Sequence, residues 1–207
     1  NSKTSVIAIF DIGKTNKKFL LFDKSYQIVL EKTVQLEEIQ DEDGESCENI
    51  EALTRWVKTT YAEACENTSF IIEALNFSTY GASFVHLDNR GKPATPLYNY
   101  LKKFPDDLHQ KFYSNYGGES VLARATASPV LGNLNSGLQI YLLKHAKPEK
   151  FRNIKVSLHL PQYMSSLFTG HFFSDITSIG CHTHLWDFNK QAYHGWVQAE
   201  DFLKLLP

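Results

Sequence analysis

The segment from residue 10 to residue 23, FDIGKTNKKFLLFD, brings together the residue types that meet phosphate. Two apolar, strand-like runs flank a turn at Gly13, where a small residue lets backbone N–H groups face an anion. Side chains that could donate to a phosphate are Lys14, Thr15, Asn16, Lys17 and Lys18. Asp11, directly before the turn, can hold Mg²⁺ through water beside a transferring phosphate. The pattern indicates phosphoryl transfer, with a lysine-rich β-turn capped by an aspartate as the alternative.

This segment is not a P-loop, although Gly13, Lys14 and Thr15 match the last part of GxxxxGK[ST]. Position 8 is alanine where that motif needs its first glycine. The chain also continues as a strand-like run over residues 18–22 instead of opening a helix. A phosphate-binding β-hairpin is therefore the better interpretation.

The composition is that of an ordinary globular protein and excludes several classes of partner. With 207 residues, 43% of them hydrophobic, the chain can form one substantial domain or one lobe of a larger enzyme. A formal net charge of -2 gives no general attraction to nucleic acid or to anionic lipid. Three widely spaced cysteines form no disulfide framework, and no apolar run suits a signal peptide or a membrane span. We therefore expect a cytoplasmic protein that has neither nucleic acid nor membrane as a partner.

Strand and helix patterns place the hairpin at the start of an α/β unit. Strands are expected at residues 6–10, 19–23, 26–34, 70–77 and 84–87. The continuous apolar run at 6–10 predicts a strand buried on both faces. Apolar residues at helical spacing predict a helix over residues 49–65, with Asn49 as its N-cap. The order βββαβ is what an actin-like, ribonuclease H-like lobe begins with, although other α/β folds share it.

The acidic stretch and the second half of the chain complete this outline. Residues 37–48 include seven acidic residues and no basic one, which predicts a solvated loop without chemistry. Further helices are expected at 106–115, 136–146, 161–168 and 198–206, and a short strand at 154–158. Neither a repeat nor a low-complexity linker divides the chain, so residues 1–207 are expected to form one unit.

Several weak motifs in a fixed order give the chain a resemblance to the FGGY carbohydrate kinases. Asp11, Gly13, Thr15 and Lys18 match D-x-G-[TS]-[TS]-x-x-[RK], with lysine at position 14 as a departure. Residues 78–82 and 85–93 resemble the turn and hairpin that follow in that family. Residues 160–170, and then 175–187, are similar to its LPDYLxxxLTG and D-x-x-x-AS-x-T-L-x-D segments.

The resemblance implies a fold, a reaction and a set of roles. The fold would be an α/β, ribonuclease H-like (actin-like ATPase) lobe with a mixed central sheet flanked by helices. The reaction would move the γ-phosphoryl group of ATP, with Mg²⁺, to a hydroxyl of a ketose or polyol. Asp11 would organise the metal, residues 13–16 would hold phosphate, and Lys18 would offset developing charge. The sugar would be positioned by Thr79, Tyr80, Tyr98, Asn99 and Asp175.

Two departures from the family pattern limit what this chain is expected to do. Where many members have W-x-D-x-R in the sugar pocket, this chain has Tyr98 and Asn99 without the acid and the arginine. The G-G-D-x-x-[AG] segment that carries the family's general base does not follow residue 196. We therefore expect an N-terminal lobe that is inactive alone, with the C-terminal lobe as its partner and a homodimer left open. The alternative function is a non-catalytic actin-like module that binds a nucleotide or a sugar.

Other sites fit the sequence less well. Cys181, His182 and His184, with acidic residues nearby, suggest zinc, but a second ligand pair at metal-binding spacing is missing. The two histidines are better explained as a pocket wall or as core residues. A serine hydrolase would need a GxSxG elbow, which the chain lacks.

Overall fold

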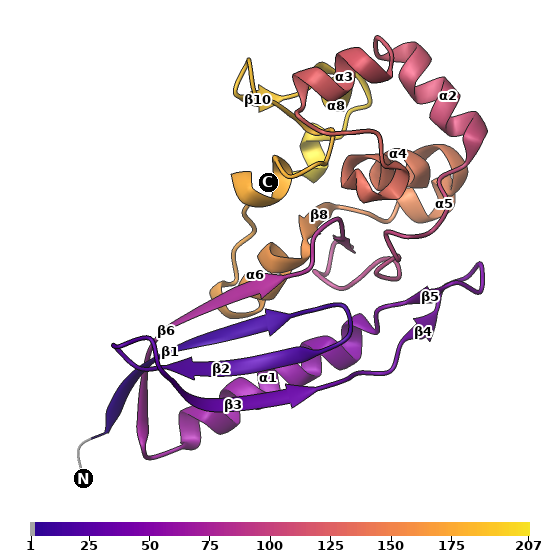
Figure 1. The fold of residues 1–207 in the computed structure, drawn as a ribbon. Coiled ribbons are helices and arrows are strands. Elements are labelled where there is room, and N and C mark those ends of the chain that lie inside the picture. The colour runs from indigo at the N-terminus through magenta and orange to yellow at the C-terminus, as the bar shows by residue number, and fades with distance from the viewer. Residues whose placement is uncertain (1–2) are drawn as a thin grey trace.

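The computed structural model describes residues 3–207 and contains a four-stranded mixed sheet in the order β3-β2-β1-β6 (Figure 1). Strand β1 (Thr4–Ile12) pairs antiparallel with β2 (Lys17–Phe22) and parallel with β6 (Phe70–Thr79), and β2 pairs antiparallel with β3 (Ile28–Val34). Helix α1 (Ile50–Glu66) lies along one face of this sheet (Figure 1). The predicted order βββαβ is confirmed for this sheet and its helix, and two further short strands lie between β3 and α1.

The alternation of buried and exposed side chains along the strands shows which face of the sheet α1 covers. Val6, Ala8, Phe10 and Ile12 all point inward and are buried, as are the inward residues of β2. Ile7, on the outer face, is 36% exposed. The expectation of a strand buried on both faces is therefore wrong for this chain, because an apolar run alone does not reveal whether a second layer covers the sheet.

The capping interaction predicted at the start of α1 is present. The Asn49 side chain accepts a hydrogen bond from the Ala52 N–H at 3.0 Å, which satisfies one of the unpaired donors of the first turn. The inner side of α1 presents Leu53 and Val57, which have no exposed surface. This face packs against the buried residues of the hairpin strands in one hydrophobic core.

The second half of the chain forms a mainly helical layer above the sheet (Figure 1). Its helices are α2 (Asp106–Asn115), α3 (Glu119–Ala125), α4 (Ser136–Ala146), α5 (Pro148–Phe151) and α8 (Gly195–Ala199), with 3₁₀ turns at Gly132–Leu134 and Leu203–Leu205. A separate aromatic core holds it together, in which Phe112 contacts Tyr141 and Trp196 edge to face at ring distances of 5.0 Å.

The two layers are joined by a short two-stranded sheet and a helix. Strands β7 (Phe84–Leu87) and β8 (Val156–His159) pair antiparallel, and α6 (Leu160–Thr169) continues directly from β8. Helix α7 (Ile176–Ile179) and the pair β9 (Trp186–Asp187) and β10 (Ala192–Tyr193) follow. Helix α6 packs against the sheet, where Phe168 contacts Phe77 of β6.

Most predicted helices of this half are confirmed, and the last is wrong. Helices α2 and α4 have the expected bounds, and α6 ends at Gly170, whose φ of 70° gives the left-handed cap. The continuous helix expected over 198–206 is broken. Asp201 has a φ of 60°, so α8 ends and only a 3₁₀ turn follows.

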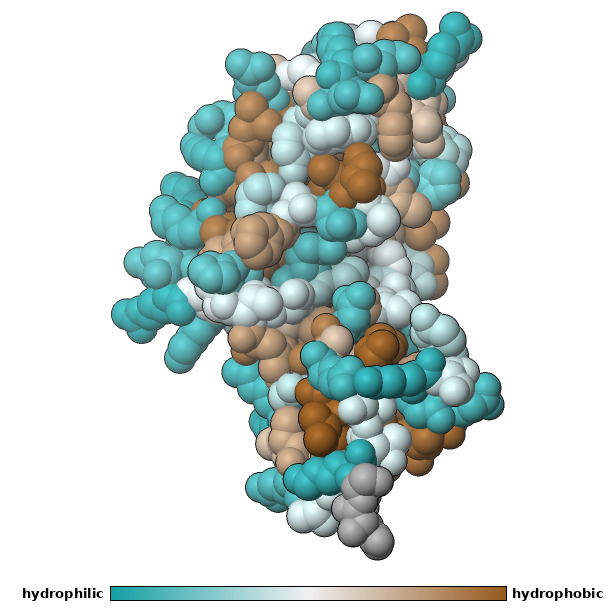
Figure 2. Space-filling view, turned by 90° about the vertical axis from the view of Figure 1, so that its left-hand side faces the viewer, coloured by the Kyte–Doolittle hydropathy of each residue, from teal (hydrophilic) through white to brown (hydrophobic). Residues whose placement is uncertain are grey.

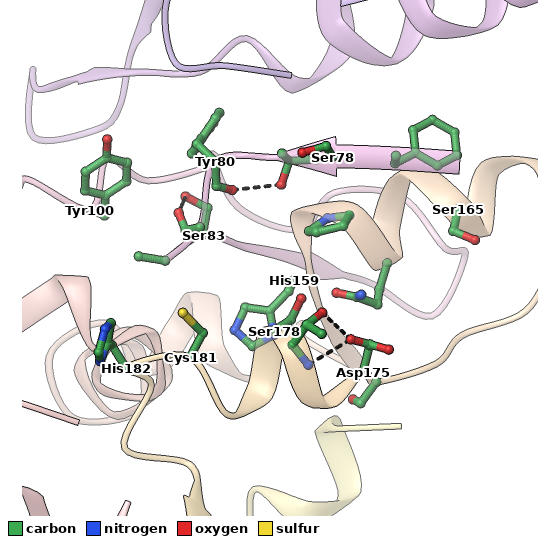
Figure 3. Close-up of a pocket in the computed structure, with 18 of the residues that line it drawn as sticks. Ser78, Tyr80, Ser83, Tyr100, His159, Ser165, Asp175, Ser178, Cys181 and His182 are labelled. Atoms are coloured by element: carbon green, nitrogen blue, oxygen red, sulfur yellow. Dashed lines mark hydrogen bonds between the residues drawn. The ribbon is translucent and has the colours of Figure 1, made fainter. Parts of the chain in front are cut away.

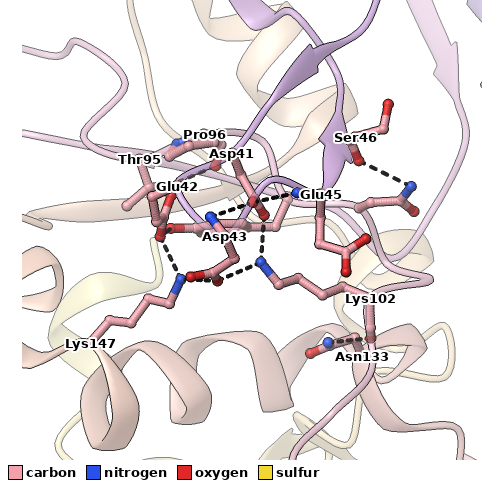
Figure 4. A network of polar contacts seen from close by, with 12 residues as sticks. Asp41, Glu42, Asp43, Glu45, Ser46, Thr95, Pro96, Lys102, Asn133 and Lys147 are labelled. Carbon is pink, nitrogen blue, oxygen red and sulfur yellow. Dashed lines mark hydrogen bonds and ion pairs between the residues drawn. The ribbon is translucent and has the colours of Figure 1, made fainter.

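The acidic stretch is not the solvated loop that its composition predicts. It forms a small hairpin of β4 (Ile39–Gln40) and β5 (Ser46–Cys47), whose turn faces lysines of the helical layer (Figure 4). Lys102 Nζ lies 2.5 Å from Asp41 and 2.7 Å from Asp43. The Asp41 side chain has no exposed surface. Tertiary ion pairs therefore fix a segment that sequence composition assigns to solvent.

Apolar side chains on the face drawn in Figure 2 lie in separate patches among polar ones. In the described chain, residues 3–207, no helix is both long enough and apolar enough to cross a membrane.

Candidate functional site

A cleft of about 860 Å³ lies between the end of β6 and the segment that leads from α6 to α7 (Figure 3). Ser78, Tyr80 and Ser83 form one wall, and Asp175 and Ser178 face them from the other (Figure 3). The walls come from the sheet layer and from the helical layer, so the cleft lies where the two layers meet. Its size suits a small polar molecule.

The lining of the cleft is rich in hydroxyl groups. Seven serine or threonine side chains contribute: Ser78, Thr79, Ser83, Ser165, Ser174, Thr177 and Ser178. The rings of Tyr100 and Phe173 also line it. Among residues 3–207, neither a lysine nor an arginine belongs to the lining. Hydroxyls that donate and accept, with a few aromatic rings, are suited to a neutral polyol.

Asp175 is the one carboxylate in this lining, and it is held in place by the start of α7. Its Oδ1 accepts a hydrogen bond from the Thr177 N–H at 2.8 Å and another from the Thr177 hydroxyl. This N-cap interaction fixes the side chain against the cleft wall. The second carboxylate oxygen, Oδ2, is left to accept from a ligand hydroxyl.

Thr79 and Tyr80 reach the cleft from the end of β6, but their hydroxyls are engaged within the protein. The Thr79 hydroxyl donates to the Tyr80 carbonyl at 2.8 Å. The Tyr80 hydroxyl donates to Glu48 Oε2 at 3.2 Å. Tyr80 therefore contributes to the cleft wall while its polar end is anchored elsewhere.

The hairpin turn between β1 and β2 lies beside this cleft. Asp11 is in register with Ser78 across the parallel β1–β6 ladder, and residues in register project to the same face. Ser78 lines the cleft, so Asp11 lies directly beside a residue of the cleft wall, and Asp11 itself is exposed. The ion pairs of the hairpin in the described chain involve its lysines and leave the Asp11 carboxylate out.

The turn itself is tight and needs its glycine. The Gly13 N–H donates to the Asn16 carbonyl at 2.9 Å, and a Cβ on Gly13 would lie 2.9 Å from that same oxygen. Thr15 and Asn16 are exposed at the tip. The turn thus offers small, accessible donors next to Asp11.

The three lysines of the hairpin have different surroundings. Lys14 pairs with Glu38, and Lys18 lies 3.1 Å from Glu31, both at the surface, where ion pairs are weak and readily exchanged for another anion. Lys17 instead points inward, 1% exposed, because it shares the inner face of β2 with Phe19. The expectation that Lys17 donates to phosphate is therefore wrong.

Comparison with known proteins identifies the family. The model of the FGGY family of carbohydrate kinases, N-terminal domain, matches residues 6–199. The chain belongs to the FGGY family. The resemblance inferred from the hairpin and the downstream motifs is thus confirmed.

Relatives of this FGGY chain are sugar kinases. Rhamnulokinase from Halalkalibacterium halodurans is 23% identical over 184 residues, which cover 86% of this chain and 39% of the relative. A carbohydrate kinase from Novosphingobium aromaticivorans superposes with a TM-score of 0.82 at 22% identity, over 97% of this chain and 42% of the other. Xylulose kinase from Rhodospirillum rubrum superposes with a TM-score of 0.85 at 14% identity, over 98% of this chain and 43% of the other. These superpositions confirm the predicted ribonuclease H-like fold, and the chain spans about two fifths of its relatives' length.

Two of the residues predicted to contact sugar lie outside the cleft of the FGGY chain. Tyr98 and Asn99 line a second cavity of about 140 Å³ under the acidic hairpin. The Tyr98 hydroxyl donates to Glu42 at 2.6 Å, and the Asn99 amide donates to the Ser46 carbonyl at 3.3 Å. The structure brings Thr79, Tyr80 and Asp175 together at the cleft, and Tyr100 lines it whereas Tyr98 does not.

The histidines near Cys181 divide as the sequence suggested. His182 lines the cleft, whereas His184 is fully buried and bonds to Tyr113 and Thr126 at 2.9 and 3.0 Å. Within residues 3–207, no group of three or more histidine, cysteine or acidic side chains is placed to hold a metal ion.

His159 is a cleft residue that sequence reasoning missed. It ends β8, lines the cleft, and its Nε2 lies 2.9 Å from the Ser136 hydroxyl. His86 lies beside it in the β7–β8 sheet and bonds to Ser157 at 2.8 Å. Burial lowers the pKa of both imidazoles to about 3, so both are neutral in the folded protein at neutral pH. The burial of β8 does not alternate, since Ser157, Leu158 and His159 are all buried, so strand alternation carries no signal for this position.

We expect these two histidines to make the protein acid-sensitive. Below the ordinary histidine pKa of 6.5 the unfolded chain takes up protons that the folded chain refuses, so stability falls as pH drops from 6.5 toward 3. At pH 5 the loss is about 2 kcal/mol for each histidine. Urea unfolding of the full-length protein at pH 7.5 and pH 5 measures this loss of unfolding free energy.

A matched pair of substitutions separates this effect from general acid sensitivity. His86→Leu should make the pH dependence shallower, whereas the same change at exposed His171 should leave it as it is. Equal unfolding free energies at pH 7.5 and pH 5 would contradict the expectation.

Proposed function

We propose that this chain is the N-terminal, sugar-binding lobe of an ATP-dependent carbohydrate kinase, with the C-terminal lobe outside residues 1–207. The reaction is transfer of the γ-phosphoryl group of ATP to a hydroxyl of a ketose or related polyol. One observation carries the proposal: the hydroxyl-lined cleft and the hairpin turn meet on adjacent strands, at the Asp11–Ser78 pair. A sugar and a phosphate bound at these two places would be neighbours.

The residues of the hairpin fit the binding of Mg²⁺ and phosphate. Asp11 offers an exposed carboxylate that no lysine of the hairpin neutralises, and hard oxygen ligands of this kind suit Mg²⁺. Backbone and side-chain donors of residues 13–16 would hold the phosphates of ATP, and Lys18 would offset charge. Bound Mg²⁺ would supply charge neutralisation at the transferring phosphate.

The cleft favours a neutral sugar. An acidic sugar, such as the substrate named for the gluconate kinase of Lactobacillus acidophilus, needs a cation beside its carboxylate, and the described lining contains neither lysine nor arginine. Asp175 would repel such a carboxylate and would accept from a hydroxyl instead. Thr79, Tyr80 and Asp175 would position the sugar, together with Tyr100.

The catalytic base belongs to residues outside this chain, so the lobe alone is inactive and needs its C-terminal partner. The proposal also includes a cytoplasmic location and a small-molecule sugar as the substrate.

ADP formation by the full-length protein tests the proposal. The assay offers ATP and Mg²⁺ with rhamnulose, xylulose, glycerol or gluconate in turn. Turnover with a neutral ketose and none with gluconate supports it. A full-length protein that binds ATP but turns over none of these would be a binding module instead, and turnover by residues 1–207 alone would contradict the missing base.

A further inference from the structure

Two buried charges lie between the hairpin and the cleft. The side chains of Lys17 and Glu48 are each 1% exposed, and Lys17 Nζ lies 3.0 Å from Glu48 Oε2. Glu48 directly precedes the N-cap of α1, while Lys17 opens β2. The other carboxylate oxygen, Oε1, finds no hydrogen-bond partner in the described part of the chain.

This ion pair contacts both halves of the site. On one side, Lys17 Nζ donates to the Lys14 carbonyl at 2.9 Å, inside the hairpin turn. On the other, Glu48 Oε2 accepts from the hydroxyl of Tyr80, which lines the cleft. Burial and then the Glu48 carboxylate raise the pKa of Tyr80, so its hydroxyl stays protonated as the donor.

Tyr80 also contacts the neighbouring parts of the site directly. Lys14 Nζ lies 5.8 Å from the centre of the Tyr80 ring, within the range of a cation–π contact. The ring of Tyr100, another cleft residue, lies 6.0 Å from it. A movement of the hairpin would therefore be transmitted to the cleft through the side chain of Tyr80.

Stability alone does not explain why these charges are buried. Removing two charges from water costs as much as their attraction returns, and apolar residues of similar volume often hold a fold equally well. What an ion pair with directed hydrogen bonds adds is a fixed geometry. Here that geometry relates the Lys14 carbonyl to the Tyr80 hydroxyl.

We propose that Lys17 and Glu48 are positioning residues that set the phosphate hairpin against the sugar cleft through Tyr80, and thereby couple nucleotide binding to sugar binding. The inference rests on the proposed kinase function. Neither residue touches a ligand; each acts through the hairpin or through Tyr80.

The test is a matched pair of tyrosine substitutions in the full-length protein. Tyr80→Phe removes only the hydroxyl that bonds to Glu48. Tyr116→Phe is the control, because the Tyr116 hydroxyl donates to Glu200, a largely buried glutamate that is likewise paired with a lysine, Lys144, at 2.6 Å. That second network lies in the aromatic core of the helical layer.

The measurement is calorimetric binding of AMP-PNP with Mg²⁺, with and without saturating rhamnulose. In the wild type and in Tyr116→Phe we expect rhamnulose to tighten AMP-PNP binding by about tenfold, a typical coupling. In Tyr80→Phe we expect the factor to fall to about two or less, with affinity for AMP-PNP alone unchanged. A merely structural role would weaken each ligand separately and would leave their coupling intact.

The outcomes separate this inference from the kinase proposal. A wild-type enzyme that forms ADP but shows no coupling, or equal coupling in Tyr80→Phe and Tyr116→Phe, overturns the positioning role alone. Absence of ADP formation with every sugar overturns the kinase proposal, and the binding measurement still decides whether the two ligands are coupled.

Discussion

Asp11→Asn is expected to lower kcat of the proposed full-length kinase by at least about 10²-fold, the scale seen when one preorganised electrostatic contact to the transition state is lost. Asparagine keeps the size of the side chain but not its negative charge, so Mg²⁺ beside the transferring phosphate would lose its anchor. Asp11 is suited to this role because it is exposed at the end of β1, in register with Ser78 of the cleft. Sugar affinity should stay unchanged, because the cleft lining does not include Asp11.

Asp23→Asn provides the matched control. Asp23 follows the opposite end of β2, where its Oδ1 accepts from the N–H groups of Ser25 and Gln27 at 2.8 and 2.9 Å. Asparagine retains that oxygen, so the turn should persist and kcat should not change. Steady-state kinetics at saturating sugar and varied Mg²⁺ compares the two variants. A kcat for Asp11→Asn within about twofold of wild type would contradict a role in holding the metal.

Local rules accounted for the parts of the fold that depend on neighbours in sequence. Helix α1 follows from its apolar spacing and the Asn49 cap, and α6 ends where Gly170 supplies a left-handed residue. The hairpin can be predicted because a glycine turn with lysine and aspartate lies between two apolar runs in one short segment. These features need no knowledge of what packs against them.

The features that the sequence did not reveal depend on partners far along the chain. Lys17 and Lys18 are adjacent lysines, yet strand alternation buries the first and exposes the second. The sequence does contain a signal for this difference, because Lys17 lies two residues before the buried Phe19 and therefore shares its face of the strand. Its acidic partner at position 48 could not be chosen from the seven acidic residues of that stretch without the fold.

The cleft that we propose as the sugar site shows the same division. The place of Asp175 in a family-like motif predicts a contact with sugar, and the structure puts this residue in the cleft. The place of Tyr98 and Asn99 in another motif predicts the same, but both side chains bond to the acidic hairpin. His159 cannot be predicted in this way, because a histidine at the end of a short strand carries no pattern of its own.

Lys17→Met is expected to lower the free energy of unfolding by about 3–5 kcal/mol, because it leaves the Glu48 carboxylate buried without its counter-charge. Both side chains are 1% exposed, so water cannot replace the lost lysine without opening the structure. The Lys14 carbonyl would also lose its donor. Urea unfolding of the full-length protein measures the loss.

The double variant Lys17→Met with Glu48→Leu is expected to recover most of that free energy, since it buries neither charge and leaves only two neutral groups, the Lys14 carbonyl and the Tyr80 hydroxyl, without their partners. Lys144→Met is the control on the other lysine–glutamate pair. Its lysine is 31% exposed, so water can solvate Glu200 after the change, and a smaller loss is expected. If the double variant were as unstable as Lys17→Met alone, unpaired charge would not be the cause. A stable double variant would also separate stability from function, because it should fold like the wild type and yet lack the coupling between AMP-PNP and rhamnulose.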